Sequence, residues 1–221
     1  MQNSGGPTTA AQHALDALRK AIVAGELRPG RQLRQEEIAE TLGTSVAPVR
    51  EALRALEQEG QVLYRPRRGY FITELRIEDL TEIYALREVL EERALKHALP
   101  DLDDDAIERI ALAATECANA AHRGDVAAEL AANRRFHFAM LDSGDQPHLM
   151  RLIQLLWDST EAYRAMYYNS AEERSATVDA HNTILTAVRR RDVADTATEL
   201  RAHRDRALDV LTRMLDTGNP S

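Results

Sequence analysis

Three histidines and one asparagine in the C-terminal half have the types and spacing of a metal-binding set. Asn133 and His137 lie four residues apart, so on a helix they share one face, with Cβ atoms about 5–6 Å apart. His181 and His203 fall in two later stretches with helical periodicity. Three imidazoles and one oxygen donor pointing into a helical core would suit Zn²⁺, with Ni²⁺ or Mn²⁺ as alternatives.

The same residues allow a second interpretation. A histidine in a helix is usually exposed or is a core residue with satisfied hydrogen bonds, and spacing alone leaves this open. The remaining histidines have no other metal-ligating residues at a matching spacing, so we interpret them as exposed or as core residues with satisfied hydrogen bonds. They are His13, His97, His122 and His148. Water on an open metal position could also serve a metalloenzyme. No HExxH or similar acid/base motif accompanies the histidines, so we expect no enzyme and no catalytic residue.

Composition restricts the class of protein. The chain has 221 residues, 44% of them hydrophobic and 29% charged, which is typical of a soluble globular protein with one or two domains. The lone cysteine, Cys117, excludes a disulfide framework and indicates a reducing compartment. Neither a membrane-length apolar run nor a signal-peptide core is present. We therefore expect a cytoplasmic protein with no membrane partner.

Charge is distributed unevenly between the two parts of the chain. The first 75 residues carry 10 Lys and Arg against 9 Asp and Glu, and the rest carry 18 against 27, which gives the net charge of −8. This asymmetry suits a chain whose first part meets phosphate and whose second part does not.

The positively balanced part has the pattern of a winged helix-turn-helix. Leu15, Leu18 and Ile22 recur at helical spacing before Gly25. Two more helices and a hairpin are then predicted, over Gln35–Leu42, Val46–Glu59, Gln61–Arg65 and Tyr70–Thr73. Gly43 supplies the turn before the third helix, which would be the recognition helix.

The residues expected to contact DNA lie at the start of that third helix and in the hairpin turn. A recognition helix presents its first residues and its free amide groups to the major groove and to phosphate. The arginines of the turn suit a groove, although each alone could be part of a solvated face. The predicted set is Arg34, Ser45, Val46, Ala47, Arg50, Arg65, Arg67, Arg68 and Gly69.

Long amphipathic stretches fill the remainder of the chain. They are predicted as helices over 78–98, 103–123, 125–143, 148–168, 171–190 and 193–216. Short connections between them favour an antiparallel bundle of six or seven helices. The expected protein is mainly α, with a disordered lead-in over 1–9, a winged helix-turn-helix over 10–75 and an all-helical domain over 76–217.

Motifs in the first part resemble a known family. Ala17–Leu75 is similar to the winged-helix domain of GntR-type regulators. The resemblance is carried by the runs IVAGELRPG from Ile22, EEIAETLG from Glu36, PVREAL from Pro48 and RPRRG from Arg65. The family usually has arginine where this chain has Val46, which offers only apolar contact to a base. DNA binding is implied, but the family's usual operator preference is not.

The second part, about Ile77–Leu215, resembles the FCD sensor domain of the fatty-acid-regulator branch of that family. The carrying runs are YALR from Tyr84, NRRFH from Asn133, HNTIL from His181 and AH at His203. The resemblance implies that a metal is held by Asn133, His137, His181 and His203. Asn133 stands where the family often has aspartate. It also implies a small carboxylate or hydroxy-acid effector.

Arg87 matches the cation that would hold such an acid, although a pair with Glu91 one turn later is an equal alternative. Arg134 and Tyr163 are looser candidates for the effector pocket. Taken together, the resemblances imply a homodimeric transcription regulator that binds a pseudo-palindromic DNA operator under effector control. A purely structural helical dimerisation domain, without metal, is the remaining alternative.

Overall fold

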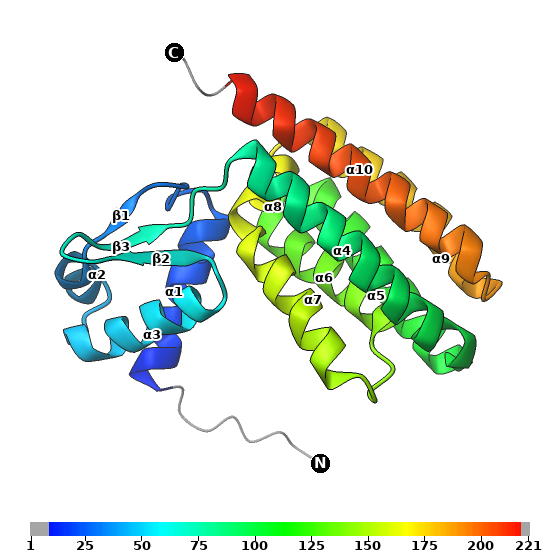
Figure 1. Cartoon of the computed structure of the whole chain (residues 1–221), viewed down its shortest axis with the longest axis horizontal. Coiled ribbons are helices and arrows are strands. Elements are labelled where there is room, and N and C mark those ends of the chain that lie inside the picture. The colour runs from blue at the N-terminus through cyan, green and yellow to red at the C-terminus, as the bar shows by residue number, and fades with distance from the viewer. Residues whose placement is uncertain (1–8, 218–221) are drawn as a thin grey trace. The chain divides into compact units, whose positions relative to one another are not determined.

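The computed structural model describes residues 9–217, which form two units that meet between Glu74 and Leu75 (Figure 1). Residues 1–8 of the predicted lead-in lie outside the described residues. Thr9 caps the first helix, because its side chain accepts a hydrogen bond from the backbone N–H of Gln12. No helix of the described residues is long and apolar enough to cross a membrane.

Over residues 9–74, the N-terminal unit contains three helices and a small sheet. Its elements are α1 (Ala10–Val23), β1 (Gln32–Leu33), α2 (Gln35–Thr41), α3 (Val46–Gln58), β2 (Val62–Arg65) and β3 (Gly69–Ile72). The strands are antiparallel in the order β1-β3-β2. The apolar faces of the helices meet the sheet in a core that includes Leu18, Ile22, Leu53, Leu56 and Ile72. The predicted winged helix-turn-helix is confirmed.

The turn that starts the recognition helix follows from Gly43. Its φ of +64° lies in the left-handed region, which glycine adopts without a steric cost. The Gly43 N–H donates to Glu40 and the Thr44 N–H donates to Ala39, so the free carbonyls at the end of α2 are satisfied. Ser45 occupies the N-cap position of α3 as predicted, but its side chain makes no capping hydrogen bond.

The C-terminal unit is a helical bundle. Its elements are α4 (Ile77–Ala98), a 3₁₀ turn (Leu99–Asp101), α5 (Asp104–Arg123), α6 (Val126–Leu141), α7 (Pro147–Ser159), α8 (Glu161–Tyr168), α9 (Ala171–Arg189) and α10 (Val193–Thr217). The most closely packed helices are α5 with α6, and α9 with both α5 and α10. The core includes Leu95, Ile110, Phe136, Met140 and Ile184. Within residues 9–217 this unit has seven α-helices, the upper end of the predicted number.

Two elements differ from the sequence prediction. The two-residue strand β1 was not predicted, because Gln32 and Leu33 are too few to show an alternating pattern. The helix predicted over 148–168 is broken at Thr160, whose φ of −106° and ψ of 8° are not helical. At the break the Trp157 carbonyl accepts from the Thr160 N–H at 3.3 Å, and Arg164 Nη2 also donates to it, at 2.9 Å.

Candidate metal and effector site

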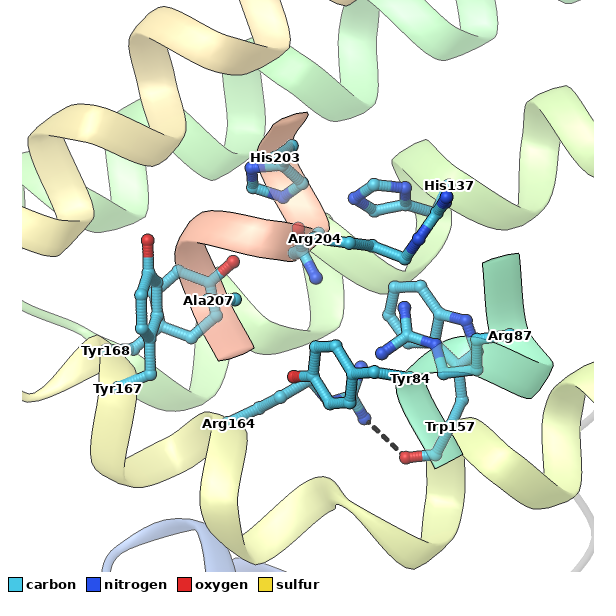
Figure 2. A pocket seen from close by; sticks show the side chains of 11 residues that line it. Tyr84, Arg87, His137, Trp157, Arg164, Tyr167, Tyr168, His203, Arg204 and Ala207 are labelled. Carbon is cyan, nitrogen blue, oxygen red and sulfur yellow. Dashed lines mark hydrogen bonds between the residues drawn. The ribbon is translucent and has the colours of Figure 1, made fainter. Parts of the chain in front are cut away.

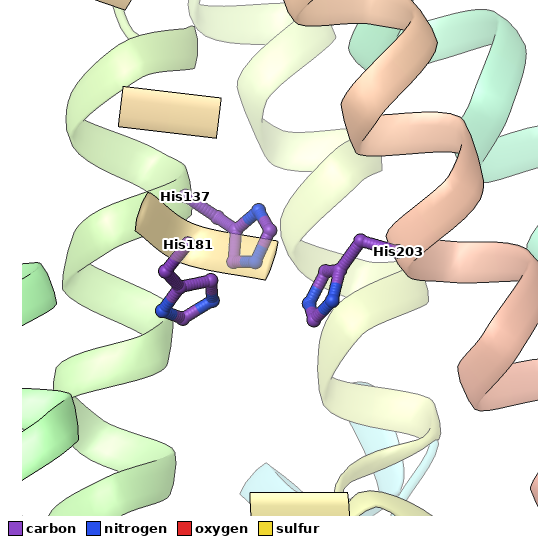
Figure 3. A group of neighbouring side chains, drawn as sticks. All are labelled: His137, His181 and His203. Atoms are coloured by element: carbon purple, nitrogen blue, oxygen red, sulfur yellow. The ribbon is translucent and has the colours of Figure 1, made fainter. Parts of the chain in front are cut away.

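The three predicted histidines come together in the C-terminal unit. His137 comes from α6, His181 from α9 and His203 from α10, and one ring nitrogen of each lies within 4.8 Å of the others. Figure 3 shows the three imidazoles turned toward one another. His137 and His181 are 2% and 1% exposed. Helices far apart in sequence thus build one compact set of nitrogen donors.

Several polar atoms of this set have no hydrogen-bond partner. They are Asn133 Oδ1, His137 Nδ1, both ring nitrogens of His181, and His203 Nδ1, and all are buried. A buried polar atom without a partner costs about 1–3 kcal/mol, so such a cluster is unusual in a folded core. A divalent cation could take one ring nitrogen of each histidine, so it would satisfy several of these atoms, and the residues fit a metal.

The protonation state of the histidines also fits a metal. Burial, together with the nearby cations Arg87 and Arg204, lowers the pKa of His203 to about 4. Burial and the neighbouring histidines hold the pKa of His137 and of His181 well below the usual range. The imidazoles are therefore neutral near pH 7, and the neutral ring is the form that binds a metal.

A cavity of about 390 Å³, its mouth included, lies beside the histidines. Figure 2 shows the aromatic and cationic side chains around it. The lining residues are Tyr84, Arg87, Asn133, His137, Trp157, Arg164, Tyr167, Tyr168, His203, Arg204 and Ala207.

One buried carboxylate organises the cationic wall of the cavity. Glu91 Oε1 accepts from Arg87 Nε at 2.9 Å and from Trp157 Nε1 at 2.8 Å, and its Oε2 accepts from Arg204 Nη1 at 3.0 Å. Burial raises the pKa of Glu91, but the two arginines and these hydrogen bonds outweigh it and keep the pKa below its usual value. Glu91 is therefore ionised and holds both guanidinium groups in place.

The candidate effector residues fall into two groups. Arg87 makes the ion pair with Glu91, and because it also lines the cavity, its role in binding an effector stays a prediction that this ion pair does not exclude. Arg134 instead pairs with Asp158 at 2.6 Å, and the Tyr163 hydroxyl accepts from the Leu75 N–H at 2.7 Å. Neither Arg134 nor Tyr163 is among the residues that line the cavity.

Two lining arginines were missed by sequence reasoning. Arg204 follows His203 directly, and Arg164 lies one turn after the break at Thr160. Arginines in amphipathic helices are usually solvated, and nothing in their local sequence separates these two from the exposed ones. Adjacency to His203 was the one available signal for Arg204.

The predicted DNA-binding residues lie on α3, just before α2, and in the β2–β3 turn. Ser45, Ala47 and Arg50 are exposed at the start of α3, and Val46 is half-buried. Arg34 is exposed and pairs with Glu37 at 3.0 Å. These placements leave the start of the recognition helix accessible to a groove.

The turn of the hairpin is cationic. Arg65 and Arg68 lie over the Phe71 ring, with Cζ 4.8 and 5.6 Å from its centroid. Arg67 is exposed and has a φ of +62°, and Gly69 pairs with Arg65 across the hairpin. The hairpin therefore presents three guanidinium groups in four residues, as a contact with phosphate requires.

Comparison with known proteins agrees with both units. The model for bacterial regulatory proteins of the gntR family matches residues 10–72, and the FCD domain model matches residues 82–206. The HTH-type transcriptional regulator YdhC of Bacillus subtilis is 27% identical over 202 residues, covering 91% of this chain and 90% of that protein. A probable D-xylose utilization operon transcriptional repressor of Paenarthrobacter nicotinovorans is 32% identical over 144 residues, covering 65% and 63%.

Solved structures share the fold. McbR/YncC of Escherichia coli aligns with a TM-score of 0.81 at 23% identity, covering 94% of this chain and 99% of that one. The FCD model alone matches more than half of the chain. The chain therefore belongs to the GntR-family transcriptional regulators that carry an FCD domain, and it is a DNA-binding regulator rather than an enzyme.

Proposed function

We propose that this regulator holds a divalent metal, Zn²⁺ in the first place, in its C-terminal unit and binds a small carboxylic acid beside it. The observation that supports this most strongly is the set of buried, unpartnered nitrogens on His137, His181 and His203. Asn133 Oδ1, also unpartnered, is the proposed fourth protein ligand. When bound, the metal supplies a Lewis-acidic centre for one end of the acid.

The cationic wall completes the proposed effector site. Arg87 and Arg204 lie against the cavity and each presents a planar fork of N–H donors, which matches the geometry of a carboxylate. Glu91 fixes these two arginines from behind, so little side-chain freedom is lost when an acid binds. Aromatic rings supply the apolar part of the cavity.

We propose that the protein works in the cytoplasm as a homodimer on a pseudo-palindromic operator. Ser45, Val46, Ala47 and Arg50 would meet the major groove, while the arginines of the hairpin turn meet the backbone. We propose repression as its role, in line with the description of the Paenarthrobacter relative. An acid can change operator affinity only by its different affinity for the DNA-competent and DNA-incompetent arrangements.

The first test is metal content and thermal unfolding. We expect the purified protein to retain about one metal per chain, and chelation to lower the unfolding midpoint. His181→Ala should abolish retention, whereas His122→Ala, which removes an exposed histidine of α5, should not. A wild-type protein that binds no divalent ion would contradict the metal site. It would support the purely structural helical domain instead.

The second test concerns DNA. Arg50→Ala should abolish the shift of a DNA fragment from around the protein's own gene at moderate salt. Arg109→Ala, an exposed arginine of α5 in the other unit, is the matched control. Equal loss of binding in both variants would argue against the assigned role of Arg50.

A further inference from the structure

Arg164 has unused hydrogen-bonding capacity inside the cavity. Its side chain is only 7% exposed, and it lines the cavity from α8. Its Nη2 donates to the Trp157 carbonyl and to Glu161 Oε2, at 2.9 and 2.7 Å. Its Nε and Nη1 are buried and have no partner. A guanidinium group has five N–H donors, so much of its capacity is left for a ligand.

The position of Arg164 separates it from the proposed metal. Figure 2 shows the imidazoles of His137 and His203 on one side of the cavity and Arg164 on the other, with Arg204 between. The Arg164 guanidinium lies over the Trp157 ring, with Cζ 4.3 Å from its centroid. Ligand-binding groups therefore lie on two separate sides of the cavity, the histidines on one side and Arg164 on the other.

The charges around the cavity do not balance. Three guanidinium groups line it, those of Arg87, Arg164 and Arg204. Glu91 is shared between the first and the third, and Glu161 holds a single nitrogen of Arg164. A buried guanidinium group favours an anion as its hydrogen-bond partner.

We infer that the effector is a short dicarboxylic acid, with one carboxylate beside the histidines, Arg87 and Arg204, and the second on the free Nη1 of Arg164. This inference rests on the proposed function, because it uses the same cavity. Tyr84 and Trp157 then lie along the carbon chain between the two ends. Malate and 2-hydroxyglutarate are acids of this class.

The test compares pairs of acids that differ only at the distal end. Titration calorimetry of the zinc-loaded, full-length protein would use 2-hydroxyglutarate against 2-hydroxyvalerate, and malate against 2-hydroxybutyrate. A hydrogen bond to a charged group contributes about 1.5–3 kcal/mol, so we expect one dicarboxylate to bind at least about tenfold more tightly than its partner. This comparison needs no variant.

Substitution then assigns the preference to one residue. In Arg164→Gln the tenfold preference should fall to near one, with the affinity for the monocarboxylate unchanged. Arg164→Lys, which keeps the charge but not the Nη1 donor, should retain part of it. Arg134→Gln removes an arginine that does not line the cavity and should leave the preference intact.

The outcomes separate this inference from the proposed function. Equal affinity for the two members of each pair would overturn the dicarboxylate inference and leave the carboxylate sensor standing. A preference that survives in Arg164→Gln would overturn the role of Arg164. If none of the four acids binds the zinc-loaded protein, the proposed effector site fails and the inference fails with it.

Discussion

Glu129 carries a buried carboxylate that the C-terminal unit accommodates without a partner. It lies on α6 one turn before Asn133, is 0% exposed, and has no hydrogen bond to either side-chain oxygen. Burial raises the pKa of Glu129 to about 7, and the charge of Arg174 opposes this only in part. We expect Glu129→Gln, which resembles the protonated side chain, to remove a pH dependence from folding.

The sign and size follow from the shifted pKa. In the unfolded chain the carboxyl has its ordinary value of 4.5, and in the folded chain it titrates at about 7. A group whose pKa is raised by folding stabilises the folded state fully below pH 4.5, and this contribution is lost as the pH rises to about 7. The difference corresponds to about 3 kcal/mol in the free energy of unfolding.

The assay is urea unfolding of metal-free protein at pH 5 and pH 7.5. The single tryptophan, Trp157, lies in the C-terminal unit, so its fluorescence reports that unit. Between the two pH values, wild type should lose about 2–3 kcal/mol relative to Glu129→Gln. Glu172→Gln, an exposed carboxylate of α9, controls for the change in net charge. Parallel pH profiles for wild type and Glu129→Gln would refute the reasoning.

Three further substitutions test other parts of the molecule. Glu91→Leu should lower the free energy of unfolding by about 3–5 kcal/mol, because Arg87 and Arg204 would keep buried charges without their partner. Urea titration measures this free energy, and a loss below about 1 kcal/mol would contradict the prediction. Arg67→Ala should weaken binding to all DNA sequences alike and reduce the slope of log K against log salt by about 1, measured by fluorescence anisotropy. Val46→Arg should change which operator sequence is preferred, with a preference between bases of about 1–3 kcal/mol at each base pair that the new arginine contacts. Selection from a random DNA library measures this preference. An unchanged preference would show that position 46 does not face a base.

The fold was largely predictable because its signals are local. Helical periodicity together with Gly25, Gly43 and Gly124 placed most helix ends within two residues of those observed. The strand β1 was missed for the opposite reason. It exists because β3 offers an edge to Gln32 and Leu33, and such pairing is not visible in the two residues themselves.

The candidate site was predictable only in part. The three histidines could be recognised because imidazole is a common metal ligand and their spacing resembles that of the family. The structure brings their ring nitrogens together. The arginines gave no such signal, since the chain has 28 Lys and Arg and most such side chains are solvated. Which few are buried depends on how α8 and α10 rotate in the bundle, and that is a property of tertiary packing.

The break at Thr160 connects the failed helix prediction with the candidate site. An uninterrupted helix over 148–168 would bond the Trp157 carbonyl to a backbone N–H four residues later. In the observed chain the Thr160 N–H, three residues later, donates to that carbonyl at 3.3 Å, and the side chains of Thr160 and Arg164 also donate to it, at 3.2 and 2.9 Å. The interruption therefore draws a guanidinium group into the cavity wall, against Trp157. Departures from local sequence rules are expected where a protein uses a residue for function, and this one lies at the position from which Arg164 reaches the cavity.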